Sequence, residues 1–325
     1  MNKILLLKIF FSFILNIFII INILDEKNKL KNYKICLCTN GKRENLYVRE
    51  YVKHYIDYGV DKIFIYDNNE ENGERFQEVI NDYINKGYVE IINYRGLIAP
   101  QAKVYKDCYK KNYKKYNWLI FYDMDEYIYL KNFKNIKIYL KQKKFYKCQR
   151  IQLNWIFHTD NNLLFYDNRT LSKRFPEREK KARGKKKGGI QGVKSILKGN
   201  IETNIYDVHV LNHNLTGCDG FGNIKYIKAI STDISDFEYF YINHYYSKST
   251  EEFINKLMRG SAVHGFDINH KLKRIDVYFS LNDITFEKIN YIEKKTKLDL
   301  TKFKIVSPKL GIKILDNNPF LNKLF

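Results

Sequence analysis

The chain has 325 residues, and its 57 Lys and Arg against 36 Asp and Glu give a formal net charge of +21. Hydrophobic residues make up 45% of the chain and only 4 residues are proline, which excludes a disordered polyelectrolyte and a fibrous protein. The length predicts one large α/β domain with an appendage, or about two ordinary domains. Because the positive charge is mainly lysine spread along the chain, and not clustered arginine, we expect no nucleic-acid partner.

An apolar segment at the amino terminus has the length of a membrane-spanning helix. The run from Ile9 to Leu24 carries no charge, lysines precede it and acidic residues follow it. About 20 apolar residues cross a bilayer, and this distribution of charge keeps the amino terminus in the cytoplasm. We predict a signal-anchor transmembrane helix over residues 1–24, a short stem over residues 25–32, and a single-pass membrane protein whose body lies in the Golgi or ER lumen if the cell is eukaryotic. A cleaved signal peptide is the alternative, although no pair of small residues follows the segment.

Strand and helix patterns alternate in the next part of the chain. Short apolar runs bounded by turn residues predict buried strands at residues 33–39, 62–66, 88–94 and 118–122. Apolar residues at helical spacing predict helices between these strands, at residues 46–58, 76–84 and 101–113. This alternation predicts a parallel sheet covered by helices, and such sheets bind ligands beyond the carboxyl ends of their strands.

The part of the chain beyond residue 144 has a different pattern. Residues 147–157 alternate as a strand, and the turn at residues 160–162 predicts a hairpin with residues 163–166. The segment 176–192 is rich in glycine and lysine, and we interpret it as a mobile surface loop near an anionic substrate, with a localisation signal as the alternative. The helices expected in this region cover residues 250–258 and 286–296.

The five cysteines do not define a disulfide framework. Their number is odd, so at least one is unpaired, and their spacing is not that of metal ligands. Cys36 and Cys38 fall on the same side of a predicted strand, and we interpret both as small core residues. No disulfide pairing is therefore predicted.

Three of the predicted strands end in polar residues that can take part in chemistry. These residues are Thr39-Asn40, Asp67-Asn68-Asn69 and Asp123-Met124-Asp125. Two aspartates at the mouth of an apolar strand suit a hard divalent cation, which prefers oxygen ligands and leaves room for phosphate oxygens. Capping of the strand end is the alternative, but it needs one aspartate and not two followed by Glu126.

Three segments in this order resemble glycosyltransferase family 92 and its relatives among the GT-A enzymes. They are Glu50 to Asn68, Trp118 to Tyr127 with its D-x-D-E motif, and the block from His244 to Lys256 that continues to Arg259-Gly260. The resemblance implies the GT-A fold, an α/β fold with a Rossmann-like, mostly parallel central sheet. It also implies a nucleotide-sugar-binding half over residues 33–144 and an acceptor half with carboxyl-terminal helices over residues 145–325.

The activity that the resemblance implies is transfer of a sugar, expected to be galactose, from a UDP-sugar to the hydroxyl of a glycan or glycoconjugate. A divalent ion, expected to be Mn²⁺, would neutralise charge on the leaving diphosphate. The family is regarded as inverting, so a carboxylate base is expected to deprotonate the acceptor.

The resemblance also implies roles for individual residues of this chain. The expected metal ligands are Asp123, Asp125 and His244. The expected contacts to the nucleotide sugar are Thr39, Asn40, Asp67, Arg95, Gln101, Asp123 and Lys248, with Lys248 facing the diphosphate. The expected base is Asp160, with Asp219 and then Glu126 as alternatives, and Trp155 is expected either to stack on a sugar or to pack in the core.

Two other classes of protein stay open on the sequence alone. A metal-dependent phosphodiesterase or nuclease would use the same aspartates, but it would need more clustered acids and histidines than one D-x-D motif. A GT-A-like protein that has lost activity would bind glycans or nucleic acid without turnover. Hydrolysis of the donor in the presence of metal separates these classes from a transferase.

Overall fold

The computed structural model describes residues 30–179, 191–225, 230–231, 236–298 and 300, together with Ile17, Ile20 and Asn28. The predicted anchor over residues 1–24 lies outside the described residues apart from Ile17 and Ile20, and so does most of the predicted basic loop 176–192. Within the described part of the chain, no helix has both the length and the apolar character that crossing a bilayer requires.

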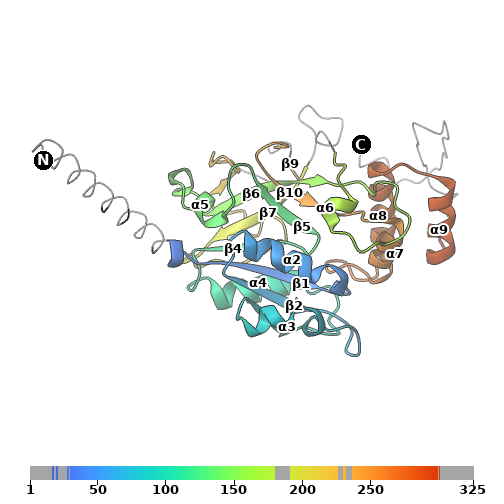
Figure 1. The fold of residues 1–325 in the computed structure, drawn as a ribbon, viewed down its shortest axis with the longest axis horizontal. Coiled ribbons are helices and arrows are strands. Elements are labelled where there is room, and N and C mark those ends of the chain that lie inside the picture. Colours follow the sequence, from blue (N-terminus) through green and yellow to red (C-terminus); the bar gives the residue numbers. More distant parts are fainter. Residues whose placement is uncertain are drawn as a thin grey trace, which may run out of the picture.

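One mixed sheet forms the centre of the molecule, with the strand order β3-β2-β1-β4-β7-β6-β10-β5 (Figure 1). The strands are β1 Ile35–Gly41, β2 Lys62–Asp67, β3 Val89–Asn93, β4 Trp118–Phe121, β5 Glu126–Leu130, β6 Arg150–Phe157, β7 Gln191–Lys198, β8 Gly217–Cys218, β9 Ile230–Ser231 and β10 Phe240–His244. Strands β1 to β4 are parallel to one another, whereas β7 runs antiparallel to both β4 and β6. The predicted parallel sheet is therefore confirmed for its first half, and antiparallel strands extend it.

The first half of the fold follows the predicted alternation of strands and helices. Its helices are α2 Asn45–Asp57, α3 Gln77–Asn85 and α4 Gln101–Asn112, and every predicted boundary in this half lies within two residues of the observed one. Successive residues of β1 point to opposite faces, so Ile35 and Leu37 pack with the α2 side of the core while Cys36 and Cys38 pack with α4. Covering both faces in this way makes β1 wholly buried.

The second half differs from the prediction at several elements. The predicted helices 250–258 and 286–296 are confirmed as α7 Thr250–Met258 and α9 Phe286–Thr296. Residues 163–166 form no strand, because the carbonyls of Leu163 and Leu164 accept hydrogen bonds from the amides of Thr250 and Glu251 at the start of α7. The elements that the sequence did not predict are β5, β7, β8, β9 and β10, the helices α5 Ile136–Leu140, α6 Leu171–Arg174 and α8 Ile268–Leu281, and the 3₁₀ helix Lys143–Phe145.

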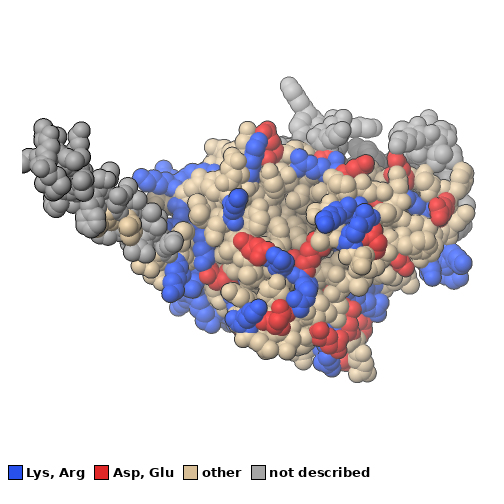
Figure 2. Space-filling model, in the orientation of Figure 1, with Lys and Arg blue, Asp and Glu red and all other residues tan. Residues whose placement is uncertain are grey.

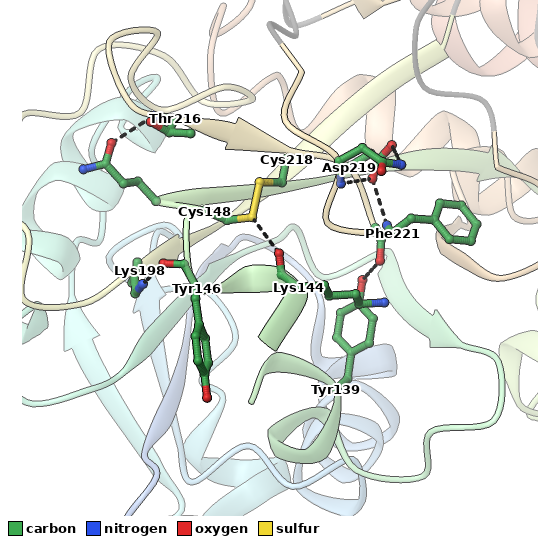
Figure 3. Close-up of a disulfide and its surroundings, with 12 residues drawn as sticks. Tyr139, Lys144, Tyr146, Cys148, Lys198, Thr216, Cys218, Asp219 and Phe221 are labelled. Atoms are coloured by element: carbon green, nitrogen blue, oxygen red, sulfur yellow. Dashed lines mark hydrogen bonds between the residues drawn. A yellow bond between two sulfur atoms is a disulfide. The ribbon is translucent and has the colours of Figure 1, made fainter. Parts of the chain in front are cut away.

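Two disulfides correct the interpretation of the cysteines. Cys38 in β1 is bonded to Cys108 in α4, and Cys148 before β6 is bonded to Cys218 in β8 (Figure 3). The expectation that Cys38 is an unpaired core residue is therefore wrong, because its face of the sheet is the one that α4 covers. Cys36 is buried and unpaired, as expected for at least one cysteine.

The Cys148–Cys218 disulfide is expected to contribute strongly to stability, since it closes a loop across a sequence separation of 70 residues. Replacing both cysteines with alanine should lower the free energy of unfolding by about 2–5 kcal/mol. Urea unfolding followed by circular dichroism measures this change. The control is Cys36→Ala, which keeps both disulfides and should cost less; equal losses in the two proteins would contradict the prediction.

Candidate functional site

A cavity of about 430 Å³ lies at the carboxyl ends of strands β1, β2, β4, β6 and β10. Five of the residues predicted to form the site line it, and these are Asn40, Gln101, Asp123, Asp125 and His244. Basic and acidic side chains are interspersed over the described residues of the face in Figure 2. This face therefore carries charge of both signs among its described residues.

The pairing of β5 with β10 brings the acidic motif to His244. The two strands are antiparallel, and their register places His244 directly opposite Glu126. One ligand atom each from Asp125, Glu126 and His244 lies within 4.8 Å of the others, and all three residues are buried. Nε2 of His244 lies 3.6 Å from Oδ1 of Asp125, so this group offers an imidazole nitrogen as well as two carboxylates. The donor set fits a divalent cation that accepts oxygen and imidazole ligands.

Asp125 stays ionised in this buried place because positive charge compensates it. Its Oδ2 forms an ion pair with Lys256, and its Oδ1 lies 3.6 Å from Nε2 of His244. Burial acts to raise the pKa of Asp125, but the charge of Lys256 and the interaction with the imidazole of His244 outweigh burial and hold this pKa well below its usual range. For Lys256 burial dominates over the attraction of Asp125, and its pKa falls to about 8.

Asp123 belongs to a different set of contacts from Asp125. Its Oδ2 lies 3.0 Å from Nζ of the buried Lys194, and its Oδ1 accepts hydrogen bonds from Tyr105 and Gln101. Burial opposes ionisation of Asp123, yet the charge of Lys194 lowers its pKa overall. Glu126 lies near the same lysine at 3.8 Å, but burial raises its pKa well above the usual range. Among the described residues, the group that could hold a metal ion thus consists of Asp125, Glu126 and His244, and Asp123 is not one of its members.

The cation predicted to face the diphosphate, Lys248, does not line the cavity. Its Nζ lies 3.3 Å from Oε2 of Glu44 and 3.2 Å from the ring centre of Tyr47. Two other cations of the same motif do line the cavity, Lys256 on α7 and Arg259 immediately after it. They are three positions apart and so share a face of the helix. This spacing is visible in the sequence and is the signal that marks the pair.

Asp67 and Arg95 lie behind the wall of the cavity. They form a buried ion pair of 2.5 Å, and Arg95 also donates to the carbonyls of Gly73 and Glu74. Asp67 accepts hydrogen bonds from the backbone and side-chain amides of Asn69. The pair therefore shapes the loop after β2, from which Asn68 reaches the cavity, while Thr39 is buried within β1.

Neither aspartate predicted as the base reaches the cavity. Asp160 follows β6, and its Oδ2 lies 2.7 Å from both Nζ of Lys288 and the hydroxyl of Tyr278, which ties it to α8 and α9. Asp219 accepts the backbone amides of Phe221 and Asn223 beside the Cys148–Cys218 disulfide (Figure 3). Both carboxylates therefore stabilise local structure away from Asp125.

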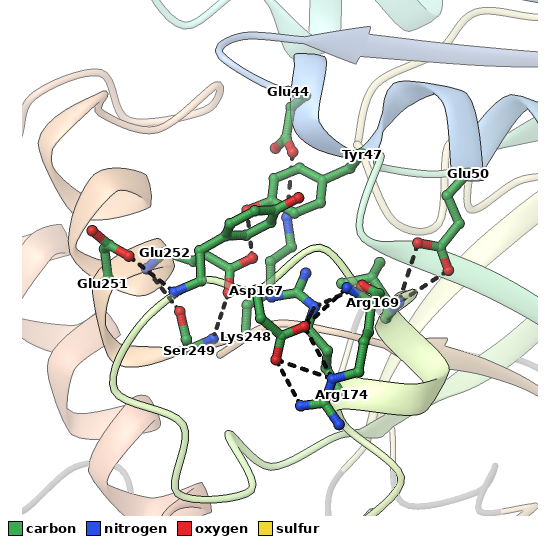
Figure 4. A network of polar contacts seen from close by, with 12 residues as sticks. Glu44, Tyr47, Glu50, Asp167, Arg169, Arg174, Lys248, Ser249, Glu251 and Glu252 are labelled. Atoms are coloured by element: carbon green, nitrogen blue, oxygen red, sulfur yellow. Dashed lines mark hydrogen bonds and ion pairs between the residues drawn. The ribbon is translucent and has the colours of Figure 1, made fainter.

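A network of buried charges fixes α7 against α2 (Figure 4). Glu252 accepts hydrogen bonds from Tyr47 and Arg174, each at 2.6 Å, and closes a capping box with Ser249 at the start of α7. Glu44 forms ion pairs with both Lys248 and Arg259. Because Lys256 and Arg259 are carried by α7, this network determines where the two cavity cations lie.

The fold and the cavity define the class: an α/β protein whose ligand site lies at the carboxyl edge of its sheet, with a buried group of two carboxylates and a histidine. The sequence model of glycosyltransferase family 92 matches residues 31–275, and the chain belongs to this family. The resemblance stated from the sequence motifs is thereby confirmed.

Plant proteins of family 92 are similar to part of this chain. A relative in Ricinus communis is 27% identical over 106 residues, which are 33% of this chain and 18% of the relative. A relative in Arabidopsis thaliana is 29% identical over 104 residues, which are 32% of this chain and 18% of that relative. The matched region thus spans less than a fifth of the length of these relatives.

Solved structures of TarS from S. aureus are also similar to this chain. The structure of TarS 1–349 in complex with UDP-GlcNAc matches with a TM-score of 0.35 and 12% sequence identity, covering 83% of this chain and 84% of that chain. TarS 1–349 in complex with UDP matches with a TM-score of 0.29 over 39% of this chain and 35% of that chain.

Glu252→Gln is expected to destabilise the protein, because it leaves the buried Arg174 without its closest carboxylate. We expect a loss of about 3–5 kcal/mol in the free energy of unfolding. Chemical denaturation measures this loss. The neighbouring variant Glu251→Gln is the matched control and should cost less than about 1 kcal/mol, since the hydrogen bond that the Glu251 carboxylate accepts among the described residues is exposed and comes from the backbone amide of Tyr166. Similar losses in the two variants would contradict the role of the network.

Proposed function

We propose that this protein is a metal-dependent, inverting glycosyltransferase of the GT-A type that transfers a sugar from a UDP-sugar, with galactose as the expected sugar, to a glycan hydroxyl. The observation that carries the proposal is that Asp125 and His244, which cluster with the buried Glu126, line one cavity together with the cations Lys256 and Arg259. Membership of family 92 supports the reaction class.

The order of the strands supports a division of the cavity between two substrates. Asn40 lies in β1 and Asn68 follows β2 on one side of β4, whereas Trp155 and His244 belong to β6 and β10 on the other side. We assign the β1 and β2 side to the nucleoside and the β6 and β10 side to the sugar and the acceptor. Asp125 follows β4, so it lies between the two sides.

The metal expected for such a transferase fits the residues present. Asp125, Glu126 and His244 would hold it, and Oε1 of Glu126, which is buried without a hydrogen-bond partner, supports this assignment. When bound, a divalent ion such as Mn²⁺ supplies positive charge that stabilises the departing nucleoside diphosphate.

The chain itself adds fixed positive charge beside that group. Arg259 is held by Glu44 at 2.5 Å and by the carbonyl of Lys42 at 2.6 Å, so its guanidinium is oriented before any ligand arrives. A cation that is already in place stabilises charge developing on a diphosphate without reorganisation during the reaction. Lys256 provides a second cation on the same helix face, and its ammonium group compensates the negative charge of Asp125.

The localisation that we propose is a membrane-anchored protein whose body lies in an oxidising compartment. The two disulfides support this placement, because disulfides persist mainly in secretory and extracytoplasmic environments. Protease treatment of sealed membrane vesicles carrying the full chain tests the topology. The body should be protected until detergent opens the vesicles, and cleavage in intact vesicles would contradict the proposal.

Asp125→Asn should abolish metal-dependent use of the donor. We expect the release of UDP from UDP-sugars with MnCl₂ to fall at least about 100-fold, because a buried carboxylate of the metal-binding group is lost. The same variant should lose the rise in melting temperature that MnCl₂ and UDP together give the unmodified protein.

Asp82→Asn is the control, because Asp82 is exposed on α3 and its ion pair among the described residues is with the surface residue Arg49. It should keep both the turnover and the thermal shift. Unchanged manganese-dependent release of UDP in Asp125→Asn would refute the metal assignment, and release of inorganic or monoester phosphate without an acceptor would favour a phosphodiesterase.

A further inference from the structure

We propose that His209 is the catalytic base that deprotonates the acceptor hydroxyl. This inference rests on the proposed transferase function and replaces the carboxylate base expected from the sequence. His209 lies in the irregular segment between β7 and β8 and lines the cavity. Neither the sequence motifs nor the resemblance singled it out.

The hydrogen bond of the imidazole fixes which nitrogen can accept a proton. Nδ1 of His209 lies 3.2 Å from the carbonyl oxygen of Val193, and a carbonyl can only accept. Nδ1 therefore carries the hydrogen, and Nε2 carries the lone pair. Nε2 has no hydrogen-bond partner among the described residues and is not among their buried unpartnered atoms, so it is open to the cavity.

The backbone around His209 is held from several directions. Ser195 donates to the carbonyl of His209 at 2.6 Å, and Asp207 accepts the amides of His209 and Val210 at 2.6 and 2.5 Å. The buried Arg150 donates to the carbonyl of Val210 at 3.2 Å. A base supported in this way is oriented before the acceptor binds, which reduces the entropy lost in reaching the reactive arrangement.

Trp155 connects His209 to the metal-binding group. Its ring centre lies 5.3 Å from that of His209 and 4.6 Å from that of His244. Gly192 allows this position, because a Cβ on that residue would lie 2.2 Å from Cε3 of Trp155. The two imidazoles therefore flank one aromatic surface, and a sugar that stacks on Trp155 would present its hydroxyls near Nε2 of His209.

The carboxylates of the cavity are each engaged by a cation, which leaves none of them poised as the base. The pairs are Glu44 with Arg259, Glu70 with Lys42 and Arg43, Asp123 with Lys194, and Asp125 with Lys256. Asp160 and Asp219 lie outside the cavity, as described above. His270 also lines the cavity, but its ring contacts the tilted ring of His264, and no hydrogen bond to a described residue fixes its tautomer.

The charges around His209 keep its ring neutral. Burial and then the charge of Lys194 lower the pKa of His209 to about 4, so near pH 7 Nε2 keeps its lone pair. Asp123 and Asp207 act in the opposite direction and stabilise the imidazolium once it forms.

In the proposed step, the acceptor O–H bond breaks and its proton moves to Nε2 of His209. The acceptor oxygen forms a bond to the anomeric carbon of the donor. The bond from that carbon to the diphosphate oxygen breaks, and its electron pair leaves with UDP. One negative charge thus leaves on UDP and one positive charge appears on the imidazole, so the step is balanced.

The test compares the full-length wild-type protein with His209→Ala, using UDP-galactose and other UDP-sugars, MnCl₂ and a panel of glycan acceptors. We expect sugar transfer by His209→Ala to fall about 10²- to 10⁴-fold. Thermal stabilisation by UDP and MnCl₂ should be unchanged, because His209 does not belong to the donor-binding group. His213→Ala, an exposed histidine on the same segment, is the control and should keep full transfer.

Chemical rescue separates a base from a structural residue. Added imidazole should restore transfer by His209→Ala at least about tenfold, whereas pyrazole, which has the same shape but is a much weaker base, should not. Transfer by His209→Ala within about threefold of wild type, or equal rescue by both compounds, would overturn the inference while leaving the transferase intact. A wild-type protein that neither binds UDP with MnCl₂ nor transfers sugar would refute the proposed function itself.

Discussion

The antiparallel pairing of β5 with β10 is the constraint on which the site depends. Glu126 opens β5 directly after the Asp123-Met124-Asp125 turn, and His244 closes β10 more than a hundred residues later. Because side chains alternate along a strand, a shift of one residue in this register would turn His244 away from the acidic motif. Parallel pairing of β10 with β6 fixes the same histidine beside Trp155 and Phe157. One short strand, β10, therefore contacts both the acidic turn and these two aromatic residues of β6.

Charge compensation is the second requirement of this site. Several carboxylates are buried within a small volume, and isolated buried charges would be strongly destabilising. Lys194 from β7 and Lys256 from α7 each approach one aspartate of the motif, while Glu44 receives Lys248 and Arg259. These ion pairs join the sheet to α2 and α7. The same contacts that neutralise the buried carboxylates therefore also determine how the last helices dock. In Figure 1, α7, α8 and α9 lie together at one end of the sheet, where this docking places them.

The parts of the fold predicted well are those with local patterns. Short apolar runs and helical spacing predicted β1 to β4 and α2 to α4, and the helix predicted at residues 250–258 is α7. The hairpin at residues 163–166 was predicted wrongly because its apolar residues satisfy the amides of a distant helix instead of a neighbouring strand. The disulfides were missed for a similar reason, since each joins cysteines 70 residues apart that only packing brings together.

The sequence by itself determined the class of fold, the acidic motif at the end of β4, the family and the helix that carries the cavity cations. Only the tertiary structure decided which members of those motifs meet. Lys248 forms an ion pair with Glu44, whereas Lys256 and Arg259 line the cavity. Glu126 lies close to Asp125 and His244, and Asp160 forms an ion pair with Lys288. His209 had no periodicity or motif to mark it. The physical reason is that hydrogen-bonding and apolar patterns act between neighbours in sequence, whereas ion pairs and cavity walls are made by residues that strand register and helix docking bring together.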